Sequence, residues 1–205
     1  MMGEKKAQDD SAVADHPNRD SSLHWIVLAT SLLTMILALA TLPMHSWMSD
    51  SGTVEINTPE LQGKQVDWEL NYGLRESISH FGEEVEITEY ECNNSDSECS
   101  GVKTAGLVAM TLIVIGALTC LISIIFTFVR SMKGKGNRAQ NQTALIGGVL
   151  VLLAPLLWFI ILPGVFPPIE GMYLGLAFYL ALVAGLLGTA GGVFAMICEE
   201  PEVSA

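Results

Sequence analysis

The sequence is short of cysteine and of basic residues, and each shortage excludes a class of protein. Its 205 residues include four cysteines, too few for a small fold held together mainly by disulfides. Ten Lys and Arg stand against 22 Asp and Glu, and a formal net charge of −12 argues against a nucleic-acid-binding protein. Half of the residues are hydrophobic, which is too many for a disordered chain.

Four long stretches also lack every Asp, Glu, Lys and Arg. They cover about 23–47, 104–129, 143–162 and 171–198. Each is close to or above the ~20 residues that a helix needs to cross a bilayer. Because backbone groups in lipid must pair within the segment, we predict an all-α membrane protein with a bundle of four transmembrane helices.

The first stretch has a second interpretation as a signal peptide, because Ala38-Leu39-Ala40 resembles a cleavage site. Two features favour a transmembrane helix. The preceding segment, 1–22, is long and acidic rather than short and basic, and the apolar run continues past Ala40.

The charge lies between and beyond these stretches. Residues 130–142 carry four basic side chains and no acid, whereas residues 48–103 carry thirteen acids and three bases. Since short cytoplasmic loops are enriched in Lys and Arg, we place 130–142 in the cytoplasm. The termini, 1–22 and 199–205, are then cytoplasmic tails, and 48–103 and the short turn 163–170 lie outside. Trp25 and Trp47 bracket the first helix as interfacial anchors.

The outer segment 48–103 has the pattern of a small antiparallel sheet. Apolar and polar residues alternate over 66–72, and shorter strands are predicted at 53–57 and 84–88. A short helix is expected over 74–81. We expect Cys92 and Cys99 to form a disulfide that stabilises this sheet; metal binding is the alternative, but His80 has no partner at ligand spacing.

Three further features are candidate sites. Asn93 is a glycosylation acceptor in Asn-Asn-Ser, and Cys198, at the inner end of the last helix, is either a palmitoylation site or an ordinary boundary cysteine. Gly188 and Gly192 form a G-x-x-x-G pair that packs helices either within the bundle or between copies. The acidic outer segment is either a weak attractor of cations or a solvated surface.

Catalytic patterns are missing from the sequence. It has no nucleophile-base-acid set, no G-x-S-x-G and no phosphate-binding loop, and its apolar stretches hold no charged residue. We therefore expect neither an enzyme nor a cofactor nor a metal site.

The sequence resembles the claudin and peripheral-myelin-protein superfamily, in its order of four spans with a large first outer loop and in a W…G-L-W…C…C signature. The matching residues are Trp47, Gly73, Leu74, Cys92, Cys99 and the entry to the second helix, 102–106. Arg75 stands at the place of the second signature Trp. The resemblance implies a left-handed bundle carrying an outer β-sheet, with Cys92–Cys99 closing two strands.

The resemblance also implies a function by contact. We expect a multi-pass protein of the plasma membrane with a structural, adhesive or lateral-assembly role, whose partners are the lipid bilayer and a second copy or another membrane protein. The alternative is an accessory subunit of a channel, transporter or membrane enzyme complex. A third hypothesis is ion selectivity through loop acids such as Asp67 and Glu69.

Overall fold

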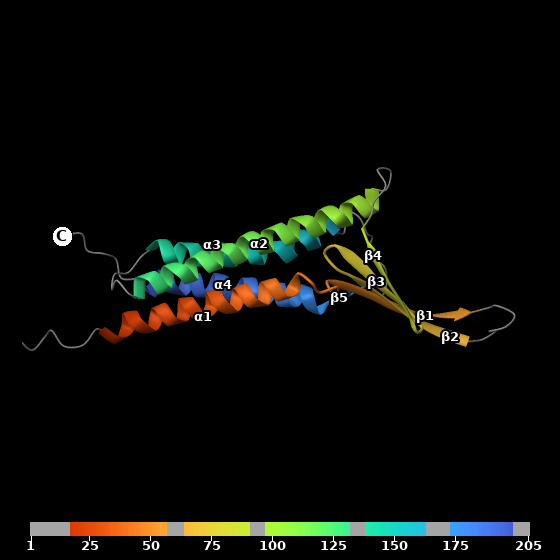
Figure 1. Cartoon of the computed structure of the whole chain (residues 1–205), viewed down its shortest axis with the longest axis horizontal. Coiled ribbons are helices and arrows are strands. Elements are labelled where there is room, and N and C mark those ends of the chain that lie inside the picture. Colours follow the sequence, from red (N-terminus) through yellow and green to blue (C-terminus); the bar gives the residue numbers. More distant parts are fainter. Residues whose placement is uncertain (1–16, 57–63, 91–96, 132–137, 163–172, 199–205) are drawn as a thin grey trace, which may run out of the picture.

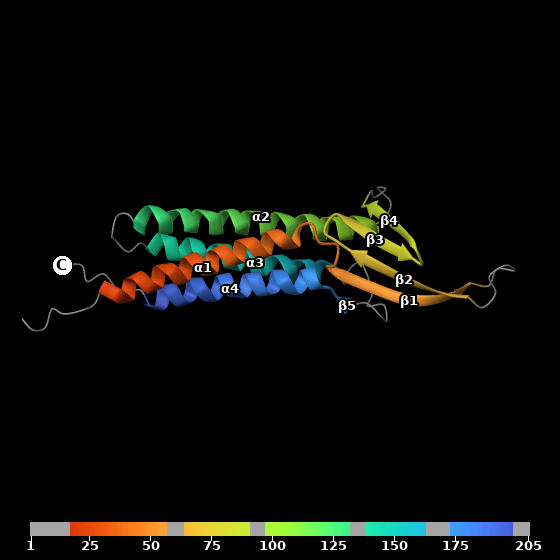
Figure 2. The same cartoon turned by 60° about the horizontal axis from the view of Figure 1, so that its bottom comes forward.

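The computed structural model describes residues 17–56, 64–90, 97–131, 138–162 and 173–198. Four helices run side by side, and an antiparallel sheet extends from one end of them (Figures 1 and 2). The helices are α1 (Pro17–Thr41), α2 (Ser97–Ser131), α3 (Arg138–Ile161) and α4 (Leu176–Cys198). Each contains a segment long and apolar enough to span a membrane, so the chain is a multi-pass membrane protein.

The helices form one bundle. α3 packs most extensively against α4 and α2, and α1 packs against α4 and α2. Backbone approaches are close where glycines face a neighbouring helix: a Cβ on Gly148 would lie 2.3 Å from the backbone of Gly188. Large side chains such as Ile160 and Phe128 point outward, as lipid-facing residues do.

Polar side chains also join the helices at the end far from the sheet. Gln140 is buried on α3, its Nε2 donates to Thr127 Oγ1 at 2.8 Å, and Ser123 Oγ donates to the Gln140 carbonyl oxygen at 3.2 Å. Hydrogen bonds of this kind tie α2 to α3 where water does not compete.

The sheet has five strands in the order β4-β3-β2-β1-β5. They are β1 (Met48–Ile56), β2 (Lys64–Tyr72), β3 (Glu76–Phe81), β4 (Glu84–Glu89) and β5 (Tyr173–Leu174). The chain turns from β3 to β4 through Gly82, whose φ of +61° favours glycine. β5 comes from just before α4, so the sheet is attached to the bundle at both α1 and α4.

The elements differ from the sequence-based expectations at several places. The helix expected over 74–81 is wrong, because residues 76–81 form β3 and pair with β2 and β4. α1 ends at Thr41 rather than near residue 47, since Pro43 disfavours helix in the residue before it and cannot donate a helical hydrogen bond. α2 begins seven residues before the expected start at 104.

Candidate functional site

Trp47 lies at the junction between the bundle and the sheet. Its side chain is 0% exposed, its Nε1 donates to the Thr41 carbonyl oxygen at 3.2 Å, and its ring centroid lies 5.5 Å from that of Trp158. Its backbone N–H donates to the Tyr72 carbonyl oxygen, and its own carbonyl accepts from Gly175. Trp47 is thus a buried connector, and the expectation that it anchors at the membrane interface is wrong; Trp25 is 65% exposed on α1.

Gly73 and Leu74 lie at the same junction, in the turn between β2 and β3, and both are buried. A Cβ on Gly73 would lie 3.2 Å from the His45 Cα. A Cβ on Gly106, in α2, would lie 2.0 Å from the Leu74 carbonyl oxygen. The backbone of the β2–β3 turn therefore rests directly on the backbone of α2, and only glycine permits that approach.

Two polar contacts surround this turn. His45 Nε2 and Glu76 Oε1 lie 2.5 Å apart, which links the α1–β1 connection to the start of β3. Tyr90 Oη donates to the Gly73 carbonyl oxygen at 3.3 Å. Burial raises the pKa of Tyr90 well above its ordinary value of 10.0, and the Tyr72 and Glu76 charges add to the rise.

This shift predicts that the junction weakens in alkali. Below pH 10 the tyrosine is neutral in both the folded and the unfolded chain, so it gives no pH dependence. Above pH 10 the unfolded chain loses the proton more readily, and the free energy of unfolding falls as pH rises. We expect a drop in Tm above pH 10 that is smaller in Tyr90→Phe. Tyr173→Phe, on exposed β5, is the control and should melt as the wild type does; an identical alkaline drop in Tyr90→Phe would contradict this assignment.

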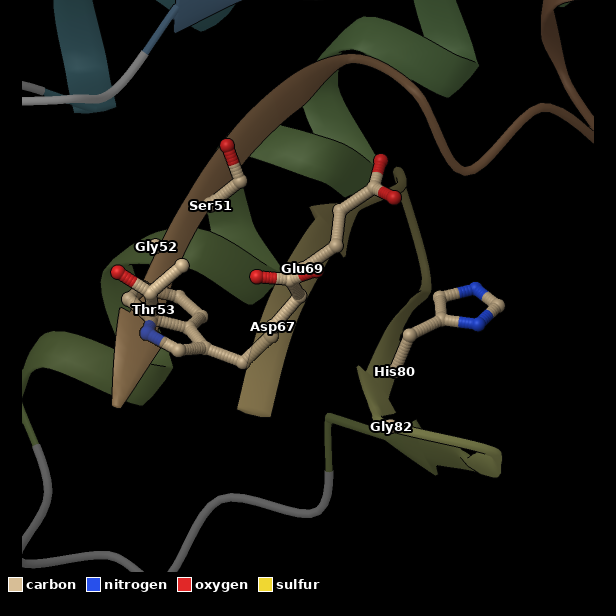
Figure 3. Close-up of a pocket in the computed structure, with 8 residues that line it drawn as sticks. Ser51, Gly52, Thr53, Asp67, Glu69, His80 and Gly82 are labelled. Atoms are coloured by element: carbon tan, nitrogen blue, oxygen red, sulfur yellow. The ribbon is translucent and has the colours of Figure 1, made fainter. Parts of the chain in front are cut away.

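The outer part of the sheet carries an open hollow of about 510 Å³, lined mainly by polar residues and by Trp68. Ser51 and Thr53 come from β1, Asp67 and Glu69 from β2 and His80 from β3 (Figure 3). Ser51, Glu69 and His80 are direct cross-strand neighbours, so they share one face of the sheet. The predicted alternation in β2 therefore places both carboxylates on this face.

A chain of side-chain hydrogen bonds orders one end of the hollow. Ser49 Oγ donates to Asn71 Oδ1 at 2.5 Å, and Asn71 Nδ2 donates to Glu69 Oε1 at 2.9 Å. The bond orients the Glu69 carboxylate, and both Glu69 and Asp67 are exposed. This arrangement gives the sheet a negative surface, whose field salt screens.

Across the described residues, no group of three or more His, Cys, Asp or Glu side chains is close enough to hold a metal ion.

The remaining sequence-predicted sites are distributed over the molecule. Cys120 and Cys198 are free thiols, whereas Cys99, at the start of α2, is not. Cys92 and Asn93 lie outside the described residues, so the Cys92–Cys99 disulfide and the glycosylation site stay predictions. Cys198 is the last residue of α4 and is partly exposed.

Gly188 and Gly192 face the interior of the bundle. A Cβ on Gly188 would meet Gly148 Cα at 2.8 Å, and one on Gly192 would meet Leu145 Cα at 2.6 Å. The structure therefore places both glycines between α4 and α3 of one chain.

Sequence reasoning did not identify the junction as a unit. It missed the roles of His45, Glu76, Tyr90 and Gly175, which come together only when the strands pair. Gly106 was visible as part of the family-like entry to α2, but nothing in the sequence indicates that it contacts Leu74.

Comparison of the sequence with protein-family models and with curated proteins gives no match in either case. Any functional interpretation therefore depends on the residues and geometry described above.

Proposed function

We propose that this chain is a claudin-like integral membrane protein that works by contact, with a structural, adhesive or lateral-assembly role carried by its acidic outer sheet. The observation that carries the proposal is the fixed attachment of that sheet to the bundle. Trp47, Gly73 and Leu74, the residues that resemble the family signature, converge on this attachment. A rigidly mounted sheet can transmit a contact to the membrane-embedded helices.

The proposal includes an orientation. The end of α2 at Ser131 and the start of α3 at Arg138, which flank the basic connection, lie at the end of the bundle opposite the sheet (Figure 1). If the positive-inside rule holds, the sheet is outside the cell and both termini are cytoplasmic, in the plasma membrane. In that compartment the Cys92–Cys99 disulfide would tie the segment after β4 to the start of α2.

The second candidate is an accessory subunit of a larger membrane complex. The observation that favours it is charge: the outer segment 48–103 carries thirteen acids against three bases, so two copies repel when their sheets face each other. A partner with a basic outer surface does not meet this repulsion.

Cross-linking on intact cells tests the proposed function. Lys64 and Lys103 are the only lysines in 48–103, so a membrane-impermeant, amine-reactive reagent should act through them. We expect adducts heavier than the monomer, at twice its mass where the partner is a second copy. Mass spectrometry of the adducts then separates a second copy from a different membrane protein. The double variant Lys64→Arg and Lys103→Arg keeps the charge and should lose the adducts. Recovery of monomer alone at every expression level would rule out the contact role.

A further inference from the structure

β4 forms one edge of the outer sheet. It pairs with β3 on one side, and no other described strand lies on its other side. All six of its residues are exposed. Phe81 and Glu84 flank the two-residue turn and form a hydrogen-bonded pair. Because hydrogen-bonded and non-hydrogen-bonded pairs alternate along an antiparallel ladder, the backbone N–H and C=O groups of Val85, Ile87 and Glu89 point away from β3.

The side chains of β4 divide into two chemically different rows. Val85 and Ile87 lie on one face and are 59% and 60% exposed. Glu84 and Glu86 alternate with them and project from the opposite face. The edge thus offers Val85 and Ile87, followed by Glu89, on one side, and Glu84 and Glu86, followed by Thr88, on the other.

Protection against aggregation explains only half of this pattern. Charged residues on an edge strand discourage pairing with other chains, and Glu84 and Glu86 satisfy that need. Val85 and Ile87 do the opposite, because exposed β-branched residues on a free edge favour strand addition. The combination of Val85 and Ile87 with carboxylates favours a partner strand that matches both rows.

A second copy of this chain is a poor partner for the edge. Antiparallel pairing of two β4 strands brings six carboxylates, Glu84, Glu86 and Glu89 of each copy, onto two neighbouring strands, and the registers that place Glu86 opposite Glu86 or Glu84 opposite Glu86 put like charges directly across from each other. Like charges on neighbouring strands destabilise pairing. A strand with Lys or Arg at alternate positions, and Val or Ile between them, would instead form opposite-charge pairs on one face and apolar pairs on the other.

We infer that the free edge of β4 binds an extended, basic polypeptide segment of a partner protein by adding it to the sheet as a sixth strand. The inference rests on the proposed contact function and names the chemistry of the partner. Backbone hydrogen bonds at Val85, Ile87 and Glu89 supply the pairing, and the alternation of side chains fixes the register.

Synthetic peptides test the inference on the full chain held in lipid nanodiscs. The probe is Lys-Val-Lys-Ile-Lys-Val, compared with a peptide of the same composition in scrambled order and with the probe N-methylated at alternate amides. We expect binding of the probe to exceed that of both controls by about tenfold, because the controls keep the charge but lose the alternation or the backbone donors. Amide exchange at Val85 and Ile87 should slow when the probe is bound.

Variants localise the site. Glu84→Gln with Glu86→Gln should weaken probe binding by about tenfold, since two cross-strand charge pairs are lost. Glu55→Gln removes a carboxylate on β1, away from the β4 edge, and should change binding less than about twofold. Val85→Thr with Ile87→Thr keeps the strand propensity and should also weaken binding.

Three results would overturn the inference. The first is no binding of the probe, and the second is equal binding of the probe and the scrambled peptide. The third is amide exchange at Val85 and Ile87 that, in the absence of peptide, becomes slower as the protein concentration rises. The last would mean that a second copy occupies the edge. The cross-linking experiment on cells does not depend on peptide binding, so failure of this inference is separate from failure of the contact role.

Discussion

Trp47→Ala is expected to release the outer sheet from the bundle and to lower the free energy of unfolding by about 3–5 kcal/mol, the range for truncating a buried aromatic residue. The side chain is fully buried against Trp158, and its indole N–H bonds the end of α1. Its removal leaves a cavity where α1, α3 and the sheet meet. In a chain of this size the loss corresponds to a fall in Tm of about 6–20 °C.

Two further tryptophan positions supply matched controls. Trp25 is 65% exposed on α1, so Trp25→Ala should change stability by less than about 0.5 kcal/mol. Trp47→Phe keeps most of the ring packing and loses the bond to Thr41, at a cost of about 1 kcal/mol from that bond. Trp158 Nε1 is buried and finds no partner among the described residues, so Trp158→Phe loses no hydrogen bond.

Thermal unfolding in detergent, together with proteolysis within the sheet, checks this prediction. We expect Trp47→Ala to be cut in the strands at temperatures where the helices stay intact, since the sheet is the part that loses its attachment. Equal melting temperatures for Trp47→Ala and Trp25→Ala would show that Trp47 does not connect the two parts.

The four spans could be predicted because apolar composition reports a lipid environment directly, without knowledge of any contact. β2 could be predicted for a similar reason. Its alternation follows from having one face more buried than the other, so the shared face of Asp67 and Glu69 was visible before any pairing was known.

β3 could not be predicted because the spacing of its apolar residues is typical of a helix, although the segment forms a strand. Leu74, Ile78 and Phe81 recur at helical spacing, and the same segment forms a strand because β2 and β4 supply hydrogen bonds on both sides. The place of His80 in the hollow depends on that register. The position of Trp47 could not be predicted either. A tryptophan after an apolar run is typical of a membrane interface, but here the chain turns after α1 at Pro43, and Trp47 lies buried between the bundle and the sheet.

Gly148→Ala is the second large prediction, and it concerns the contact between α3 and α4. The added Cβ would lie 2.3 Å from the Gly188 carbonyl carbon and 2.3 Å from the Thr189 nitrogen, and both are backbone atoms that no rotamer change can move. The two helices must therefore separate, which breaks the packing on either side of the contact. Overpacking typically costs about 1–3 kcal/mol, and we expect the upper end because backbone meets backbone.

Val149→Leu is the matched control, because it adds a methylene at the next residue of α3, which is 36% exposed. It should leave Tm within about 2 °C of the wild type, since surface substitutions have small effects. The same pair of variants decides which surface the glycines serve. If Gly148 and Gly188 pack within one bundle, Gly148→Ala lowers Tm to the same extent at every protein concentration. If they joined separate copies, the variant would lower only the dimer fraction measured by energy transfer between labelled chains, with the melting of the monomer unchanged.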